Sequence, residues 1–166
     1  MESFVIEGGK ALKGSITPQG AKNEALQILC AVLLTADKIT IHNIPDIVDV
    51  NKLINLLKNL GVKITQLGPG SYQFQSDALD LNYLNSDQFK IDGKGLRGSI
   101  MLVGPLLARF GKGSIPRPGG DKIGRRRLDT HFEGLIQLGA KFNYNKEDYF
   151  YSVEAEKLIG SDLLLD

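Results

Sequence analysis

Residues 33–41 read LLTADKITI, and residues 107–115, which lie 74 positions later, read LARFGKGSI. A second pair of words follows in the same order: residues 60–63 read LGVK, and residues 138–141, 78 positions later, read LGAK. Two matches in one order indicate an internal duplication with a period of about 75 residues. The chain is therefore expected to contain two copies of one structural unit.

Hydrophobic periodicity predicts a strand-helix-strand-helix-strand-strand order for this unit, which places the chain in the α/β class. In the first copy, Asp46 is expected to cap a helix that Gly61 ends. The helices are expected at 21–34, 46–60, 96–110 and 128–138, and the strands at 38–43, 62–66, 72–75, 113–116, 141–144 and 149–153.

Both ends of the chain depart from this order. Residues 3–7 and 12–17 precede the first copy, and their alternating pattern predicts two short strands that pair elsewhere. Residues 158–166 read as a strand that is interrupted in the middle of a fold. The chain is therefore expected to be a fragment of a longer protein.

Composition sets broad limits on function. The 166 residues carry a formal charge of +1, and 42% of them are hydrophobic, which is ordinary for a globular domain. Cys30 is the single cysteine, so no internal disulfide forms and the common zinc spacings are excluded. No basic leader and no membrane-spanning stretch are visible in the sequence, which predicts a cytoplasmic protein.

The positive charge is concentrated in one part of the chain. Residues 90–127 hold ten Lys and Arg against only Asp92 and Asp121, a net charge of +8. The second copy is also four residues longer than the first where residues 116–127 connect a strand to a helix. Extra length, glycines and charge in one connection predict a functional loop for an anionic ligand.

Three places carry candidate site residues. Lys22 and Asn23 sit at a predicted helix start, where free N–H groups favour an anion, although a solvated lysine would look the same. Arg97 begins an apolar helix. Its side chain either binds a phosphate or carboxylate group or extends into solvent. The run at 125–127 fits a compact anionic ligand, a surface without a role, or nucleic acid; the lack of interleaved aromatic residues speaks against nucleic acid.

Asp121 is the only acid between residues 93 and 128. It is either a salt-bridge partner, a helix cap or a proton donor to an anionic substrate. Neighbouring cations lower a carboxyl pKa, whereas a general acid at neutral pH needs a raised one. Bound anions would neutralise the cations and remove this conflict.

The motifs taken together resemble the enolpyruvyl transferase family. They are GAKN at 20–23, GPLLARFG at 104–111, and PGGDKIGRR at 118–126 followed by Leu128 and Asp129. The resemblance covers nearly the whole chain and implies an inverted, inside-out α/β barrel with three repeats in each of two domains. Residues 20–166 would then be two of the three units of the first domain, at about 20–92 and 93–166, and residues 1–19 would belong to the second domain.

The resemblance also implies an activity. Such an enzyme transfers the enolpyruvyl group of phosphoenolpyruvate to the 3-hydroxyl of UDP-N-acetylglucosamine and releases phosphate, as the first committed step of peptidoglycan synthesis. It needs no metal or organic cofactor, and neither nucleic acid nor a membrane is an expected partner. We expect the full-length enzyme to be a monomer and this chain alone to be inactive, since the second domain's catalytic acid and arginines are missing from it. The rival hypothesis is a stand-alone nucleotide-sugar or anion-binding module.

By the same resemblance, Lys22 holds phosphoenolpyruvate, Asn23 lies beside the sugar, and Arg97 contacts substrate phosphate or carboxylate. Arg126 bridges both substrates, and Asp121 donates the proton to C3 of phosphoenolpyruvate. The stretch that lines the UDP moiety comprises Arg126, Arg127, Leu128, Asp129 and Thr130.

The sequence departs from the common family pattern at two positions. Asp121 stands where most members have Cys, so we predict insensitivity to fosfomycin, which alkylates that Cys. Arg127 replaces a residue that is usually Pro, which leaves open how the uridine packs there.

Overall fold

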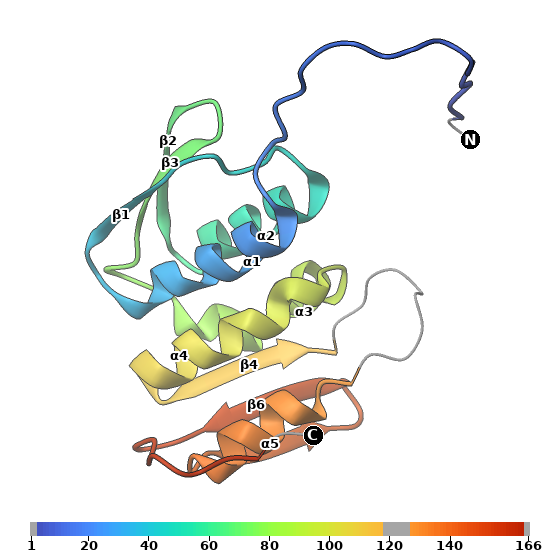
Figure 1. Cartoon of the computed structure of the whole chain (residues 1–166). Helices are drawn as coiled ribbons and strands as arrows, with labels where there is room; N and C mark the ends of the chain where they lie inside the picture. Colours follow the sequence, from blue (N-terminus) through green and yellow to red (C-terminus); the bar gives the residue numbers. More distant parts are fainter. Residues whose placement is uncertain (1–2, 118–126, 165–166) are drawn as a thin grey trace.

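The computed structural model describes residues 3–117 and 127–164, and the predicted duplication is visible in it (Figure 1). The first copy runs α1 (Lys22–Ala31), the 3₁₀-helix η1 (Val32–Leu34), β1 (Lys38–Ile41), α2 (Val48–Asn59), β2 (Lys63–Gly68) and β3 (Ser71–Gln75). The second runs η2 (Leu81–Asn85), α3 (Asp87–Lys94), η3 (Arg97–Leu102), α4 (Val103–Phe110), β4 (Lys112–Pro116), α5 (Asp129–Gln137), β5 (Lys141–Asn145) and β6 (Phe150–Glu154).

The two sheets have the same topology. The strand orders are β1-β3-β2 and β4-β6-β5, and every pairing is antiparallel. The registers also correspond. Lys38 and Lys63 both pair with Gln75, and Lys112 and Lys141 both pair with Glu154. These equivalent positions confirm the duplication that the sequence words predict.

Glycines with left-handed backbones end one helix in each copy, at equivalent positions. Gly61 follows α2 with φ +102°, and Gly139 follows α5 with φ +96°. Residues other than glycine rarely adopt this backbone conformation, which reverses the chain at the end of a helix. The matching motifs at 60–63 and 138–141 therefore mark the same turn in each copy.

The helices lie inside and the sheets outside. Figure 1 shows α1, α2, α3 and α4 stacked between the two sheets. The helices of both copies share one core, which includes the fully buried Leu29, Leu33, Leu53, Leu57, Leu102 and Leu106. Phe132 of α5 packs against Phe142 and Tyr151 of the second sheet, with ring centroids 4.7 and 5.2 Å apart. This layering fits the predicted inside-out class.

Arg109 ties the two copies together. Its Nη1 donates to the carbonyl oxygens of Leu33 and Thr35, each at 2.9 Å, at the end of η1. A charged donor satisfies two carbonyls that the helix end leaves without partners. One of the ten cations in the basic segment is therefore structural.

Three local predictions need correction. Residues 3–19 form no strand in the structure: the described chain places no strand beside them, and a strand needs a neighbour for its N–H and C=O groups. That they pair with a second domain stays a prediction. Residues 158–164 form no strand either. Asp46 does not cap α2, because its carboxylate accepts from Asn51 Nδ2 at 2.7 Å.

The second copy contains a helix that periodicity misses. Helix α3 buries only Phe89 and Gly93 and is otherwise polar, so it lacks a long apolar stripe. The predicted helix at 96–110 is divided into η3 and α4. The other predicted helices and strands are confirmed, with ends shifted by a few residues.

Candidate functional site

Several element ends meet on one side of the molecule. In Figure 1, α1, α2 and α5 begin, and β4 ends, toward the right-hand side. The first turn of a helix carries free N–H groups and a partial positive charge, which favour anions. Three of the predicted site segments, at 22–23, 97 and 127–130, belong to elements on this side.

The start of α1 is fixed by a close backbone approach. A Cβ on residue 20 would lie 2.0 Å from the carbonyl oxygen of Asn43, so only glycine fits there. Ala21 is the N-cap residue and has an extended backbone, and no side chain caps the helix. Consequently no capping side chain competes with an anion for the first N–H groups of α1.

Lys22 is paired across the two helices of the first copy. Its Nζ forms a close ion pair with Oδ2 of Asp49, which lies in the first turn of α2. The Lys22 side chain is 48% exposed and that of Asp49 is 33% exposed. The pair therefore holds the ammonium group at the helix starts while leaving it open to solvent. Asn23, one residue on, is exposed.

Arg97 lies beside α1 because of a second glycine. A Cβ on Gly98 would lie 3.2 Å from Cδ1 of Leu26, so η3 packs closely against α1 here. Leu26 is one helical turn beyond Lys22, which brings the Arg97 segment next to the start of α1. Within the described part of the chain, the Arg97 side chain has neither an ion-pair nor a hydrogen-bond partner. Its charge is thus available to an anionic ligand.

The start of α5 carries the predicted uridine-binding stretch. Leu128 is the N-cap residue, and Asp129 and Thr130 form the first turn. Arg127 donates from Nε to Oδ2 of Asp129 at 2.6 Å, and this bond holds the pKa of Asp129 below its ordinary value. The other carboxylate oxygen of Asp129 accepts from the Thr130 N–H at 3.2 Å. This carboxylate is therefore ionised, with both oxygens engaged.

Asp121 and Arg126 lie outside the described residues, so their expected roles stay predictions. The ion pair of Asp49 with Lys22 is a feature that the sequence did not reveal, because it joins residues 27 positions apart through the packing of α1 on α2. The only sequence signal was the place of Asp49 at a predicted helix start.

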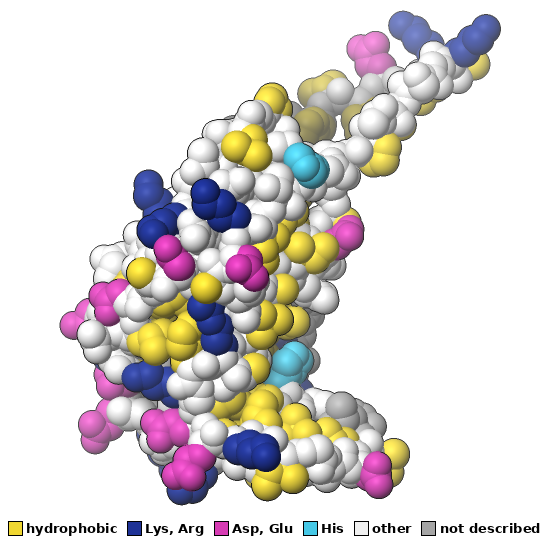
Figure 2. All heavy atoms as spheres, turned by 90° about the vertical axis from the view of Figure 1, so that its left-hand side faces the viewer, with side chains coloured by type: hydrophobic (Ala, Val, Ile, Leu, Met, Phe, Trp, Pro, Cys, Tyr) yellow, Lys and Arg dark blue, Asp and Glu magenta, His cyan; other side chains and the backbone are white. Residues whose placement is uncertain are grey.

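The described residues offer neither a metal site nor a membrane-spanning helix. No group of three or more His, Cys, Asp or Glu side chains there could hold a metal ion. No helix among them is both long enough and apolar enough to cross a membrane. The face opposite the candidate site carries both signs of charge intermixed, with hydrophobic side chains in a hollow near its lower end (Figure 2).

The sequence profile of EPSP synthase (3-phosphoshikimate 1-carboxyvinyltransferase) matches residues 6–163. The chain belongs to the EPSP synthase family. Among curated members of this family, the UDP-N-acetylglucosamine 1-carboxyvinyltransferases of Bacteroides fragilis and Porphyromonas gingivalis are 58% and 53% identical to it over 166 residues. The matches cover all of this chain but 38% of each relative. The resemblance to enolpyruvyl transferases is thereby confirmed.

Solved structures support the same fold. The enolpyruvyl transferase NikO from Streptomyces tendae superposes with a TM-score of 0.66 at 18% identity, covering 92% of this chain and 32% of NikO. An EPSP synthase from Acinetobacter baumannii superposes with a TM-score of 0.62 at 17% identity, covering 92% of this chain and 34% of that protein. The predicted enolpyruvyl-transferase fold class is therefore confirmed for this family member.

Proposed function

We propose that the protein carrying this chain transfers the enolpyruvyl group of phosphoenolpyruvate to the 3-hydroxyl of UDP-N-acetylglucosamine and releases phosphate. The observation that carries the proposal is the 58% identity, over the whole chain, to a relative named UDP-N-acetylglucosamine 1-carboxyvinyltransferase. In a bacterial cell the reaction would be the first committed step of peptidoglycan synthesis. A cytoplasmic location and a monomeric enzyme stay predictions of the sequence.

The geometry of the described residues supports anionic substrates. Phosphoenolpyruvate carries a phosphate and a carboxylate, and UDP carries two phosphates. The exposed ammonium group of Lys22 lies at the start of α1, whose first N–H groups lack a side-chain cap. Arg97 is the neighbour of Gly98, which packs against Leu26 one turn further along α1. Fixed cations and helix dipoles stabilise negative charge that grows in a transition state.

The proposed chemistry assigns a role to each residue. The 3-hydroxyl of the sugar would give its proton to the carboxylate of the second domain's catalytic acid, and its oxygen would attack C2 of phosphoenolpyruvate while Asp121 gives a proton to C3, which forms a tetrahedral phospho-intermediate. Loss of phosphate from C2 and of a proton from C3 then restores the double bond. Lys22, Arg97 and Arg126 would hold the anionic groups throughout, Asn23 would contact the sugar, and Arg127 to Thr130 would line the uridine diphosphate.

An acceptor competition tests the proposal. Phosphate release by the full-length protein is measured with phosphoenolpyruvate and either UDP-N-acetylglucosamine or shikimate 3-phosphate, the acceptor that the name of the family profile indicates. We expect release with the nucleotide sugar and none above background with shikimate 3-phosphate. The reverse pattern would contradict the proposal, and binding of UDP-N-acetylglucosamine without any turnover would favour a binding module.

A further inference from the structure

The turn between β5 and β6 contacts two segments that adjoin the candidate site in the sequence. One segment follows β4 at Arg117, where the predicted functional loop begins. The other is α3, whose last residue lies three positions before Arg97. The turn therefore contacts both the segment that leads into the predicted functional loop and the helix that precedes Arg97.

The first contact extends the ladder between β4 and β6. Pro116 pairs with Phe150 but has no N–H to donate, so the next donor along the strand is the N–H of Arg117. It donates to the carbonyl oxygen of Tyr149 at 2.7 Å. The guanidinium carbon of Arg117 also lies 6.0 Å from the centre of the Tyr149 ring. Both the backbone and the side chain of Arg117 are thus held by one residue.

The turn has a conformation that must be maintained. Tyr149 has φ +52°, a left-handed backbone that is unfavourable for a bulky residue. The side chain of Asn145 stabilises the turn: its Oδ1 accepts from the N–H groups of Glu147 and Asp148, and its Nδ2 donates to Asp148 Oδ2 at 3.2 Å. A conformation held at this cost points to a positioning role.

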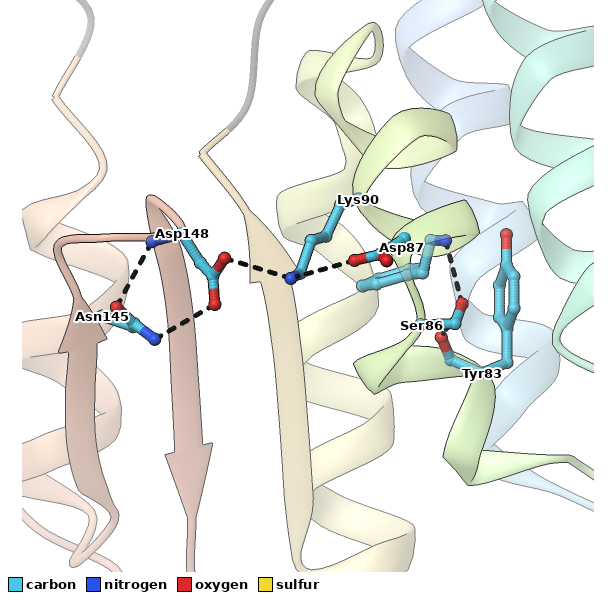
Figure 3. Close-up of polar contacts among 7 residues, drawn as sticks. Tyr83, Ser86, Asp87, Lys90, Asn145 and Asp148 are labelled. Atoms are coloured by element: carbon cyan, nitrogen blue, oxygen red, sulfur yellow. Dashed lines mark hydrogen bonds and ion pairs between the residues drawn. The ribbon is translucent and has the colours of Figure 1, made fainter.

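The second contact joins the turn to α3. Lys90 Nζ donates to Asp148 Oδ1 at 3.2 Å, and it lies at the same distance from Oδ1 of Asp87 on its own helix. Figure 3 shows Lys90 reaching past the end of β4 toward Asp148, whose other oxygen faces Asn145. These two bonds raise the pKa of Lys90, so the lysine remains charged at any physiological pH.

We infer that Lys90, Asp148 and Tyr149 form a clamp that positions Arg117, the start of the loop, relative to Arg97. The inference rests on the proposed function, because the position of Arg117 relative to Arg97 affects activity only if this site binds the proposed substrates. Lys90 and Asp148 are positioning residues, because they contact other protein groups and no proposed substrate atom. The Lys90 and Asp148 side chains are 30% and 49% exposed, so their pair can shift the arrangement of the site only modestly.

A double-mutant cycle in the full-length protein tests the clamp. The variants are Lys90→Met, Asp148→Asn and the double variant, and Asp87→Asn is the matched control because it removes the other partner of Lys90 without touching the turn. One readout is kcat and KM for phosphoenolpyruvate. The other is the rate of trypsin cleavage between Lys122 and Arg127 under native conditions, which requires no catalysis. Melting temperatures check that each variant folds.

For either single variant, the clamp predicts a drop in kcat of about two- to fivefold and a rise in the trypsin rate by a similar factor. The double variant should be no worse than the singles, the melting temperatures should hardly change, and Asp87→Asn should behave like the wild type. Single variants that match Asp87→Asn in the trypsin rate, or effects that multiply in the double variant, would overturn the clamp. If the wild-type protein lacks turnover, the proposed function fails, and the trypsin rates still decide the clamp.

Discussion

Lys22 at the start of α1 and Asp49 at the start of α2 form an ion pair that joins the two helices of the first copy. Both side chains are partly exposed, and an exposed pair of this kind contributes at most about 1 kcal/mol to stability. An anionic substrate can therefore compete with Asp49 for the ammonium group without unfolding the helices. The pair holds the Lys22 ammonium group at the start of both helices.

Replacing Lys22 by Met tests its proposed role in binding the substrate. The substitution removes the ammonium group and keeps a chain of similar length. Loss of one electrostatic contact to the transition state lowers kcat/KM by roughly 100-fold or more. The melting temperature should change little. Lys58→Met, at an exposed lysine in the last turn of α2, is the control and should keep full activity. Equal activities of both variants would refute the role.

Substitutions of Arg97 and Arg109 should have different effects, one on substrate binding and the other on stability. Arg109→Met removes two hydrogen bonds of a charged donor, which should lower the free energy of unfolding by about 1.5–3 kcal/mol. Arg97→Met removes no such bond within the described residues, so it should leave stability nearly unchanged and raise KM for the substrates. Urea denaturation and steady-state kinetics on both variants measure this contrast. Similar unfolding free energies for the two variants would contradict it.

Gly20 should not tolerate even one added methyl group. In Gly20→Ala the new Cβ would meet the Asn43 carbonyl at 2.0 Å, so the backbone must move. The expected loss in the free energy of unfolding is about 1–3 kcal/mol. Gly104→Ala is the matched control: its Cβ meets nothing within 4 Å in helix α4, and the change should stabilise by about 0.4–1 kcal/mol. Chemical denaturation of both variants gives the comparison, and a neutral Gly20→Ala would contradict this packing.

The sequence predicts those parts of the fold that local patterns determine. The apolar face of α2 at Val50, Leu53 and Leu57 repeats every three or four positions, and all three residues are fully buried. Helix α3 was missed because it has only two buried residues, although Ser86 was a usable signal: its hydroxyl accepts from the Phe89 N–H at 3.1 Å and caps the helix.

Only part of the candidate site could be predicted from the sequence, and the physical reason differs from that for the fold. A charge such as Arg97 or Lys22 can be seen in the sequence, but its partner depends on packing between distant elements. The contacts of Asp49 with Lys22 and of Asp148 with Lys90 span 27 and 58 positions. No local pattern encodes such distances. Asp46 differs, because a neighbour five positions on, Asn51, takes its carboxylate and the cap on α2 is not formed.

Stability should fall in acid partly through Asp92. Partial burial raises its carboxyl pKa, but hydrogen bonds from Tyr83 at 2.5 Å, Gln88 and Asn59 outweigh this effect, and the net pKa is lowered. A lowered pKa in the folded state stabilises the protein above the ordinary Asp value of about 3.9, and this stability is lost as the pH falls through the folded value.

The variant Tyr83→Phe isolates this effect, because the other carboxylates keep their contacts. Between about pH 6 and pH 2.5 its free energy of unfolding should fall less steeply than that of the wild type. Tyr144→Phe, which changes a ring stacked on Tyr151, should show the wild-type slope. Urea titrations across this range provide the measurement. A slope for Tyr83→Phe equal to that of the wild type would show that the Tyr83 hydrogen bond does not lower the pKa of Asp92.

The full-length enzyme should resist fosfomycin. Asp121 can donate a proton, but it cannot form the thioether by which fosfomycin inactivates family members with Cys at this position. The variant Asp121→Cys should therefore gain time-dependent inactivation while it retains turnover. Preincubation with fosfomycin, followed by a phosphate-release assay, measures both proteins. Rapid inactivation of the wild type at low fosfomycin concentration would contradict the assignment of Asp121.

The identity of the product tests the central claim most directly. The full-length protein is incubated with phosphoenolpyruvate and UDP-N-acetylglucosamine, and the nucleotide sugar is analysed by mass spectrometry and NMR. The predicted result is a UDP-N-acetylglucosamine that carries an enolpyruvyl ether at its 3-hydroxyl, formed in equal amount with phosphate and reduced about 100-fold in Lys22→Met. An unmodified nucleotide sugar, with full-length protein that is folded and binds both substrates, would contradict the claim.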